Sequence, residues 1–217
     1  MVLEKRNLHP GDLDELAAVH KSIIGALKDK QQYANTTRSE FEEILCGQGM
    51  AMGTFDKGKL VGFCIFLFPG DSGENLGIDI GLAEDELDSV VHMEAGAVLS
   101  EYRGMALVAD MANELLERIK AGARYRYVLS TVHPLNIPSL RIQFKFGLKI
   151  VALKEKYGGL MRYILMHDLH EKVQTVYCRQ RSIECRDFET QISLLSQGFK
   201  GIGFALEQGK EHIIFAK

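Results

Sequence analysis

The sequence predicts an α/β (α+β) protein in which a mixed β-sheet is flanked by helices. An apolar run at residues 90–98 predicts a strand. Leu107, Met111 and Leu115 then recur every four positions, which is the spacing of one helix face. Strand and helix patterns continue to alternate over residues 127–166. This alternation is typical of a βαβ unit with a right-handed crossover, which places two strands in parallel.

Length and composition narrow the class of protein. A chain of 217 residues can bury one large core, alone or with a small appendage, and 46% hydrophobic with 25% charged residues is ordinary for a globular protein. The net charge of −3 gives no reason to expect nucleic acid as a partner. No apolar run reaches the roughly 20 residues of a membrane span, and no apolar signal core follows the first residues. We therefore expect a cytoplasmic protein with neither a nucleic acid nor a membrane partner.

The cysteines favour the same compartment. Cys46, Cys64, Cys178 and Cys185 form no Cys-x-x-Cys pair and have no histidine-rich neighbourhood. This spacing argues against a structural metal site, so we expect no bound metal. Free thiols are typical of a reducing cytoplasm.

The N-terminal part reads as a strand followed by two helices. A strand at residues 2–7 precedes a helix that runs from residue 10 to about residue 27, opened by a Pro-Gly-Asp sequence. Thr37 and Glu40 have the spacing of a capping box, which predicts a second helix at about residues 41–46.

A hairpin and a long connection come next. Residues 50–55 and 59–68 are apolar strand patterns on either side of an Asp-Lys-Gly turn. Residues 69–87 read as a long polar connection that leads to the strand at 90–98.

The second half of the sequence continues with short alternating elements, each bounded by a turn or a cap. They are a helix at 104–120, a strand at 127–132, a short helix capped by Asn136 and ended by Gly147, a strand at 148–153, and a hairpin turn at 156–159 followed by a strand to Met166.

We place a domain boundary between residues 1–170 and a β-α-β-β extension at residues 171–217. The extension is too small for a core of its own, so it must pack on the main domain or on a second subunit, as in a homodimer. The sequence around Gly198 echoes that around Gly147, which we attribute to shared capping chemistry and not to a repeat. The elements expected in the extension are a strand at 173–178, a helix at 188–196 and strands at 199–206 and 212–215.

The turn between the strand at 90–98 and the next helix carries the clearest functional pattern. A helix N-terminus offers unpaired N–H groups and a partial positive charge to a phosphate. The turn resembles the acyl-CoA-binding turn of the GNAT acetyltransferase superfamily, Arg/Gln-x-x-Gly-x-Gly/Ala, with Arg103 at its first position. Ala106 stands where glycine is usual and Val108 where glycine or alanine is usual, so both add bulk beside the expected phosphate.

Two further segments are similar to the same superfamily. Its second motif, Asn-x-x-Ala/Ser followed by a short helix and Gly-Phe, is matched in spacing by Asn136, Ser139 and Gly147, with Leu148 for the phenylalanine. The hairpin at 156–163 resembles the closing hairpin of the fold. The resemblance covers roughly residues 1–168 and implies the GNAT acyl-CoA N-acyltransferase fold.

The resemblance implies transfer of an acetyl group from the cosubstrate acetyl-CoA to a primary amine of a small molecule or a peptide. The pyrophosphate would lie on the backbone N–H groups at the helix start, with the Arg103 charge acting directly or holding the turn. A backbone N–H near the end of the preceding strand would polarise the thioester carbonyl. The implied cofactor-binding residues are Ala97, Val98, Arg103, Gly104, Met105, Ala106, Leu107, Val108, Asn136 and Ser139; for Asn136 a plain N-cap role is an equal alternative.

The proton acceptor is sought on the strand at 90–98. An alkylammonium group with a pKa near ~10.4 must lose a proton before it attacks. The alternation of a strand places His92, Glu94, Gly96 and Val98 on one face. Glu94 is the first candidate base, because the family often has an acid on this strand, and His92 is the second. The alternative is that both only end a strand face that meets solvent.

The position of the family's general acid is changed in this sequence. The family's usual tyrosine, seven residues after the motif asparagine, is replaced by Gln143. Tyr157 or Ser139 would have to take its role, or the thiol, with a pKa of ~8.5, would leave as thiolate. Ala106, Val108 and Gln143 favour the alternative that the chain is a catalytically weak or inactive acyl-CoA-binding sensor or structural protein.

Charge patterning suggests a cationic acceptor. No Lys or Arg lies between Lys59 and Arg103. An acidic rim there would concentrate a cationic amine, whereas the alternative is an ordinary solvated loop. The acidic residues are Asp71, Glu74, Asp79, Glu84, Asp85, Glu86, Asp88, Glu94 and Glu101.

Overall fold

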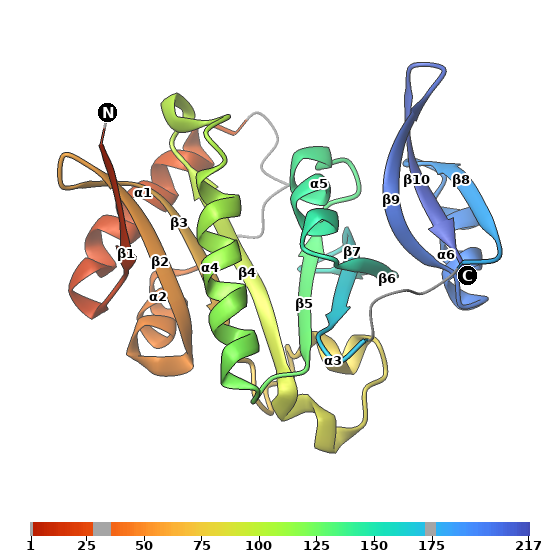
Figure 1. Ribbon diagram of the computed structural model, residues 1–217, viewed down its shortest axis with the longest axis horizontal. Helices are drawn as coiled ribbons and strands as arrows, with labels where there is room; N and C mark the ends of the chain where they lie inside the picture. Colours follow the sequence, from red (N-terminus) through yellow and green to blue (C-terminus); the bar gives the residue numbers. More distant parts are fainter. Residues whose placement is uncertain (1, 28–35, 172–176) are drawn as a thin grey trace. The chain divides into compact units, whose positions relative to one another are not determined.

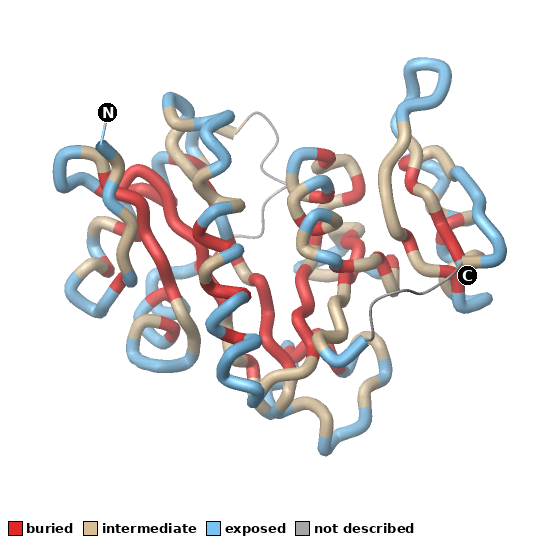
Figure 2. The backbone as a smooth tube through the Cα atoms, viewed as in Figure 1, coloured by how far each residue is buried: buried red, intermediate tan, exposed pale blue. Residues whose placement is uncertain are grey.

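The computed structural model describes residues 2–27, 36–171 and 177–217. The chain divides into two compact units, whose helices and strands are labelled in Figure 1. The first unit comprises residues 1–72 and 88–125, and the second comprises residues 73–87 and 126–217. In both units the buried segments are concentrated along the strands (Figure 2).

The first unit is an antiparallel sheet with helices on both faces. Its strand order is β1-β2-β3-β4. Apolar residues of α1 and α2 cover one face, where they pack on Phe63, Ile65 and Ala95. The elements are β1 (Leu3–Asn7), a 3-10 helix (Pro10–Asp12), α1 (Leu13–Gly25), α2 (Arg38–Glu43), a π-helix (Ile44–Gln48), β2 (Gly49–Asp56), β3 (Lys59–Leu67), β4 (Val90–Val98), a 3-10 helix (Ser100–Tyr102) and α4 (Leu107–Gly122).

The strands of this unit were predicted within a residue or two, but three helix boundaries were wrong. The capping box of Thr37 and Glu40 is confirmed, yet α2 begins directly after Thr37 and continues into the π-helix. The first helix starts as a 3-10 turn. The predicted start of α4 at Gly104 is wrong because Gly104 and Ala106 have φ angles of 81° and 57°, which no right-handed helix contains.

The second unit is also sheet-based. Its strand order is β5-β7-β6-β9-β10-β8. The elements are α3 (Leu76–Asp79), a 3-10 helix (Glu84–Ser89) that runs into the first unit, β5 (Tyr127–Val132), α5 (Ile137–Lys145), β6 (Lys149–Lys156), β7 (Leu160–Asp168), β8 (Gln180–Glu184), α6 (Phe188–Ser196), β9 (Lys200–Glu207) and β10 (Lys210–Ala216).

The alternating pattern of this unit is confirmed, with β5 and α6 at the predicted bounds. The polar connection 69–87 is not a plain loop, since it contains α3, whose N-terminus is capped by Asn75. Most of the strand predicted at 173–178 lies outside the described residues, and a strand occurs instead at β8. The boundary between residues 170 and 171 stays a prediction.

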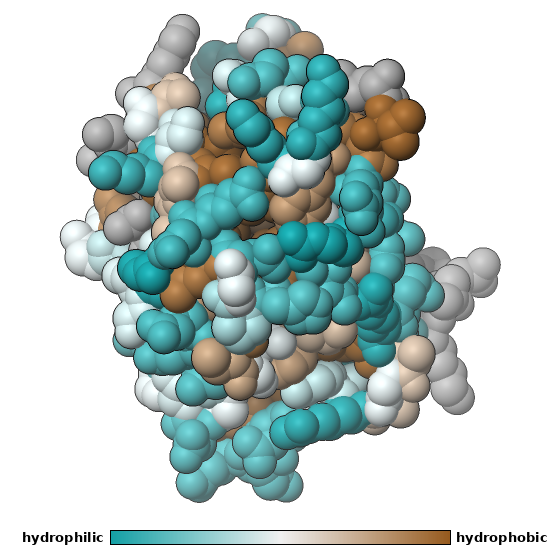
Figure 3. All heavy atoms as spheres, turned by 90° about the vertical axis from the view of Figure 1, so that its left-hand side faces the viewer, coloured by the Kyte–Doolittle hydropathy of each residue, from teal (hydrophilic) through white to brown (hydrophobic). Residues whose placement is uncertain are grey.

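The surface of the first unit on the left-hand side of Figure 1 is mostly hydrophilic, with small hydrophobic areas between polar side chains (Figure 3). Within the described ranges, no helix is long and apolar enough to cross a membrane.

Candidate functional site

Strand β4 contains a β-bulge at Glu94. Ala95 pairs with Ile65 and Met93 with Phe66, so Glu94 has no partner residue on β3. A bulge shifts the alternation of side chains by one residue. The prediction that His92 and Glu94 share a face with Gly96 and Val98 is therefore wrong for this strand.

The bulge turns the two candidate bases toward the helix pair α1 and α2. His92 now has the parity of Ala95, which packs in the cluster under these helices. The negative charge of Glu40, in α2, acts on the Glu94 carboxyl. The Nδ1 atom of His92 lies 3.9 Å from a carboxylate oxygen of Glu94, so the two candidates remain neighbours.

The environment of Glu94 suits a proton acceptor. Burial, and to a smaller extent the charge of Glu40, raises the pKa of the Glu94 carboxyl to about 7. Its side chain is 28% exposed, so a substrate proton can reach it, whereas His92 is 4% exposed. A base is most effective when its pKa lies near the working pH.

The backbone N–H groups at the end of β4 alternate in direction. The N–H of Leu99 donates to the Val61 carbonyl of β3 at 2.9 Å. Because alternate residues of a strand direct their N–H groups to opposite sides, Ala97 also faces β3 and the N–H of Val98 points away from it. Of the two predicted carbonyl-polarising donors, the geometry therefore favours Val98.

The start of α4 is open. Its N-cap is Ala106, which supplies no side-chain acceptor, and the first intrahelical bond runs from the N–H of Asp110 to the Ala106 carbonyl at 2.9 Å. The N–H groups of Leu107 and Val108 thus project beyond the helix end without an intrahelical partner. Such a terminus binds an anion through these donors and through the helix dipole.

Arg103 stands beside this open helix start and is exposed. In the described part of the chain its guanidinium makes no hydrogen bond or ion pair. The turn is held instead by Tyr102, whose hydroxyl donates to an Asp56 carboxylate oxygen at 2.8 Å. Of the two roles predicted for Arg103, the structure leaves it available for direct contact with an anion.

The sequence predicts that Val108 adds bulk beside the helix start, but the structure directs its side chain elsewhere. A Cβ placed on Gly96 would lie 2.7 Å from a methyl group of Val108, so the Val108 side chain packs on β4 where glycine leaves room. The bulk of this residue is directed at the sheet and away from the open N–H groups.

The corresponding helix start of the second unit, at α5, is closed. The Asn136 side-chain oxygen accepts the N–H of Ser139 at 3.3 Å, which is the N-cap alternative. Pro138 lies in the first turn and has no N–H to donate. A ligand could use the Asn136 oxygen only by displacing this cap.

Two side chains bear on the missing general acid. Gln143, at the position of the family tyrosine, is buried, and its amide donates to the Ser130 hydroxyl of β5 at 3.2 Å. The Tyr157 hydroxyl lies 3.2 Å from the Thr131 hydroxyl near the end of β5. Gln143 has no proton to supply as an acid, so the role stays with the predicted alternatives, Tyr157 or Ser139.

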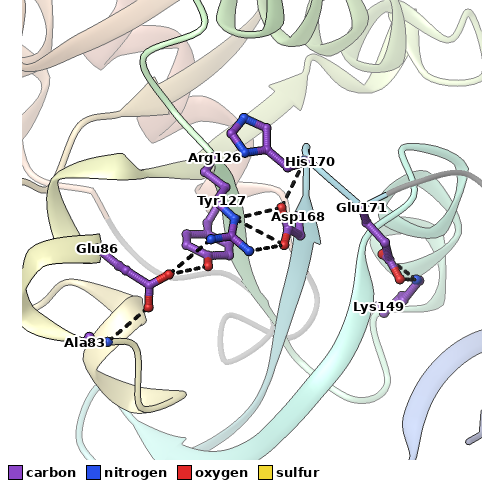
Figure 4. Close-up of polar contacts among 8 residues, drawn as sticks. All are labelled: Ala83, Glu86, Arg126, Tyr127, Lys149, Asp168, His170 and Glu171. Carbon is purple, nitrogen blue, oxygen red and sulfur yellow. Dashed lines mark hydrogen bonds and ion pairs between the residues drawn. The ribbon is translucent and has the colours of Figure 1, made fainter.

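Part of the acidic segment of the second unit is paired with cations of that unit. Arg126 donates to Asp168 at 2.9 Å and to Glu86 at 3.3 Å, and the Tyr127 hydroxyl donates to Glu86 at 2.6 Å (Figure 4). Asp79 pairs with Lys156 at 2.7 Å. These contacts fix the segment on the sheet and weaken the argument for a cationic acceptor.

Comparisons with known proteins connect this geometry to a fold. No model of a protein family matches the sequence, and no curated protein matches it. Solved structures do match. Arabidopsis thaliana NAA60 in complex with acetyl-CoA is 18% identical, with a TM-score of 0.61 over 78% of this chain and 100% of that chain.

Two bacterial structures match in the same way. The acetyltransferase of GNAT family from Streptococcus pneumoniae is 18% identical, with a TM-score of 0.59 over 77% of this chain and 99% of that chain. The ribosomal-protein-S18-alanine N-acetyltransferase from Escherichia coli is 12% identical, with a TM-score of 0.58 over 81% of this chain and 99% of that chain. At these identities the likeness is one of fold, and it confirms the predicted α/β class.

Proposed function

The chain has the fold of the GNAT N-acetyltransferases, and we propose that it is an acetyl-CoA-dependent N-acetyltransferase acting on a primary amine. The solved structures that it resembles include acetyltransferases, one of them with acetyl-CoA bound. The acceptor is proposed to be a small molecule or a peptide with a free amine. A cytoplasmic location stays a prediction, and the homodimer, predicted as one of two alternatives for the extension, is tested in the next subsection.

One observation carries the proposal: the open start of α4 with the unengaged Arg103 beside it. An uncapped helix N-terminus is costly unless water or a ligand satisfies its donors. A pyrophosphate supplies acceptors and two or more negative charges at such a place. The donors proposed for it are the N–H groups of Met105 to Val108, with the Arg103 guanidinium.

The groups of β4 supply the proposed chemistry. Glu94 accepts the proton of the amine as the new C–N bond forms, and the C–S bond breaks to release the thiol of CoA. The N–H of Val98 donates to the thioester oxygen, where negative charge develops. Tyr157 or Ser139 is the proposed proton donor to the thiolate. Ser139 remains a proposed cofactor contact, and Asn136 remains one only if the ligand displaces its N-cap bond to the Ser139 N–H.

The test is release of free thiol from acetyl-CoA in the presence of a panel of amines, together with calorimetric titration of CoA. The proposal expects CoA binding and at least one amine that accelerates thiol release above the rate of hydrolysis. Absence of CoA binding to the wild-type chain would contradict it. Arg103→Glu serves to locate the site and is discussed below.

A second candidate is a protein that binds acyl-CoA without turnover. The observation that favours it is Gln143, which turns inward to Ser130 at the position of the usual acid. The same two measurements separate the candidates, because this one expects CoA binding with no amine-dependent thiol release.

A further inference from the structure

The second unit contains two stretches with the same architecture. We name residues 127–168 module 1 and residues 177–217 module 2. Each has a strand, a helix and a β-hairpin in that order. The helices α5 and α6 start at residues 137 and 188, and the strands β6 and β9 start at residues 149 and 200. Both pairs are 51 residues apart.

The agreement extends to irregular details. The pairing of β6 with β7 skips Val151, and the pairing of β9 with β10 skips Ile202, which is again 51 residues later. A bulge is a local irregularity that ordinary hairpins do not share by position. The predicted capping chemistry would explain similar helix ends, but it gives no reason for matching bulges. We therefore correct the earlier interpretation: these modules are a structural repeat.

The helix ends match as well. Asn136 caps α5 with a φ of −86° and a ψ of 69°, and Asp187 caps α6 with a φ of −84° and a ψ of 71°. Both helices end at a glycine with positive φ, Gly147 at 77° and Gly198 at 84°.

The two modules are arranged with approximate twofold symmetry. The strand order β5-β7-β6 of module 1 is mirrored as β9-β10-β8 in module 2, and β6 pairs with β9 in antiparallel register. The residues that pair are Ile150 and Gly201, which occupy equivalent positions. Contact between equivalent positions is the mark of an isologous interface, the kind that two copies of one chain form.

One buried polar contact makes this interface specific. The Tyr163 hydroxyl of β7 donates to the Gln191 side-chain oxygen of α6 at 2.6 Å, and both side chains are fully buried. The residue of module 1 equivalent to Gln191 is Leu140. A second copy that docked through module 1 would therefore oppose Tyr163 with a leucine, and the buried phenol would lose its partner.

We propose that module 2 is an internal repeat that covers the edge of β6 in place of a second copy of this chain, so that the protein is a monomer with a built-in pseudo-partner. An uncovered β6 would be an edge strand with unpaired N–H and C=O groups, ready to pair with another chain. Module 2 occupies that edge by pairing Gly201 with Ile150, and the Tyr163–Gln191 contact favours the internal partner over another molecule. This inference is independent of the proposed activity.

The first test is the mass of the full chain in solution, measured by light scattering after size exclusion at several protein concentrations. The expected result is the monomer mass of 24.3 kDa throughout. A stable dimer of the wild-type chain would overturn the proposal.

A matched pair of variants tests the covered edge. A Cβ on Gly201 would lie 2.9 Å from two atoms of Ile150 in module 1 and 3.1 Å from Ile213 in module 2, whereas a Cβ on Gly203 meets only Ile214 at 3.9 Å. Gly201→Val should separate β9 from β6, lower the melting temperature and produce concentration-dependent association. Gly203→Val should remain a monomer with a nearly unchanged melting temperature. Equal behaviour of the two variants would overturn the proposal.

A double-mutant cycle with less disruptive substitutions tests the proposal if Gly201→Val fails to fold. Gln191→Leu should lower the melting temperature by about 5 °C because it removes the partner of the buried Tyr163 hydroxyl and also the donor to the Glu184 carbonyl at 2.9 Å. Tyr163→Phe in the same chain should restore the part of that loss that belongs to the Tyr163 contact. Additive effects of the two substitutions would show that the modules do not meet through this contact, and would contradict the proposal.

Discussion

The two units each place a helix directly after a motif-bearing strand, and they treat its first turn in opposite ways. In the first unit α4 starts at Ala106 with no side-chain cap. In the second unit α5 starts at Asn136, whose side chain already accepts a backbone N–H. An open helix start leaves donors for a ligand, whereas a capped one has satisfied them internally. The comparison therefore supports α4 as the proposed anion site, and it favours the N-cap role of Asn136 over the proposed cofactor contact.

The polar groups at the motif positions also differ between the two units in how accessible they are. Glu94 of the first unit lies at a bulge, with a pKa raised to about 7 and part of its side chain exposed. Gln143 of the second unit is buried and bonded to Ser130. Glu94 is thus left partly accessible, whereas Gln143 is engaged inside its own unit. Each prediction below tests one side of this contrast.

The largest effect is expected at Glu94. Glu94→Gln should lower the rate of acetyl transfer about 100- to 10,000-fold with nearly unchanged CoA affinity, because it removes the general base. Part of the rate should return at high pH, where more of the amine is already neutral. Steady-state kinetics against pH measure this, with His92→Gln as the milder control. Wild-type turnover in Glu94→Gln at every pH would show that the carboxylate only ends a solvated strand face.

The next effect concerns the anion site. Arg103→Glu should weaken CoA binding about 10- to 100-fold, because a charge-assisted contact is replaced by repulsion. Asn136→Ala should leave CoA affinity within a few-fold while lowering the free energy of unfolding by about 1 kcal/mol. Calorimetric titration and denaturant unfolding separate the two quantities. The reverse pattern would move the anion site from α4 to α5.

A pH-dependent stability effect follows from the raised pKa of Glu94. Between its ordinary value of 4.5 and about 7, the folded state holds a proton that the unfolded state has released. Wild-type stability contributed by this group is therefore present below pH 4.5 and lost as pH rises to 7. Glu94→Gln should be more stable than wild type by about 1–3 kcal/mol at pH 8 and equal to it near pH 4. Urea unfolding at both pH values measures this difference in stability between the variant and the wild type. A difference that is larger at pH 4 than at pH 8 would contradict the prediction.

The smallest effect tests the backbone of the open turn. Ala106 and Ala123 flank α4 with φ angles of 57° and 49°. Either residue replaced by glycine should raise the free energy of unfolding by about 0.5–1 kcal/mol, because alanine is strained at positive φ. Only Ala106→Gly should also change CoA affinity. A change of affinity in Ala123→Gly would indicate that whole-helix stability, and not the turn, controls binding.

Local signals in the sequence identified most elements and part of the site. Apolar runs bounded by turn residues gave β4 and β5 at their observed bounds, and the Thr37–Glu40 spacing gave a capping box. The Arg103 turn was found because strand, small-residue turn and amphipathic helix are contiguous. The unpredicted helix α3 is only four residues long, too short for periodicity to show.

What the sequence determined by itself is the identity and order of the elements, because hydrophobic period and caps act over a few neighbouring residues. The tertiary structure alone decided the bulge at Glu94, the facing of His92, the packing of Val108 on Gly96 and the pairing of Ile150 with Gly201. Each of these depends on register between strands or helices distant in sequence. A shift of one residue in such a register reverses which face a side chain occupies, and no local pattern encodes it.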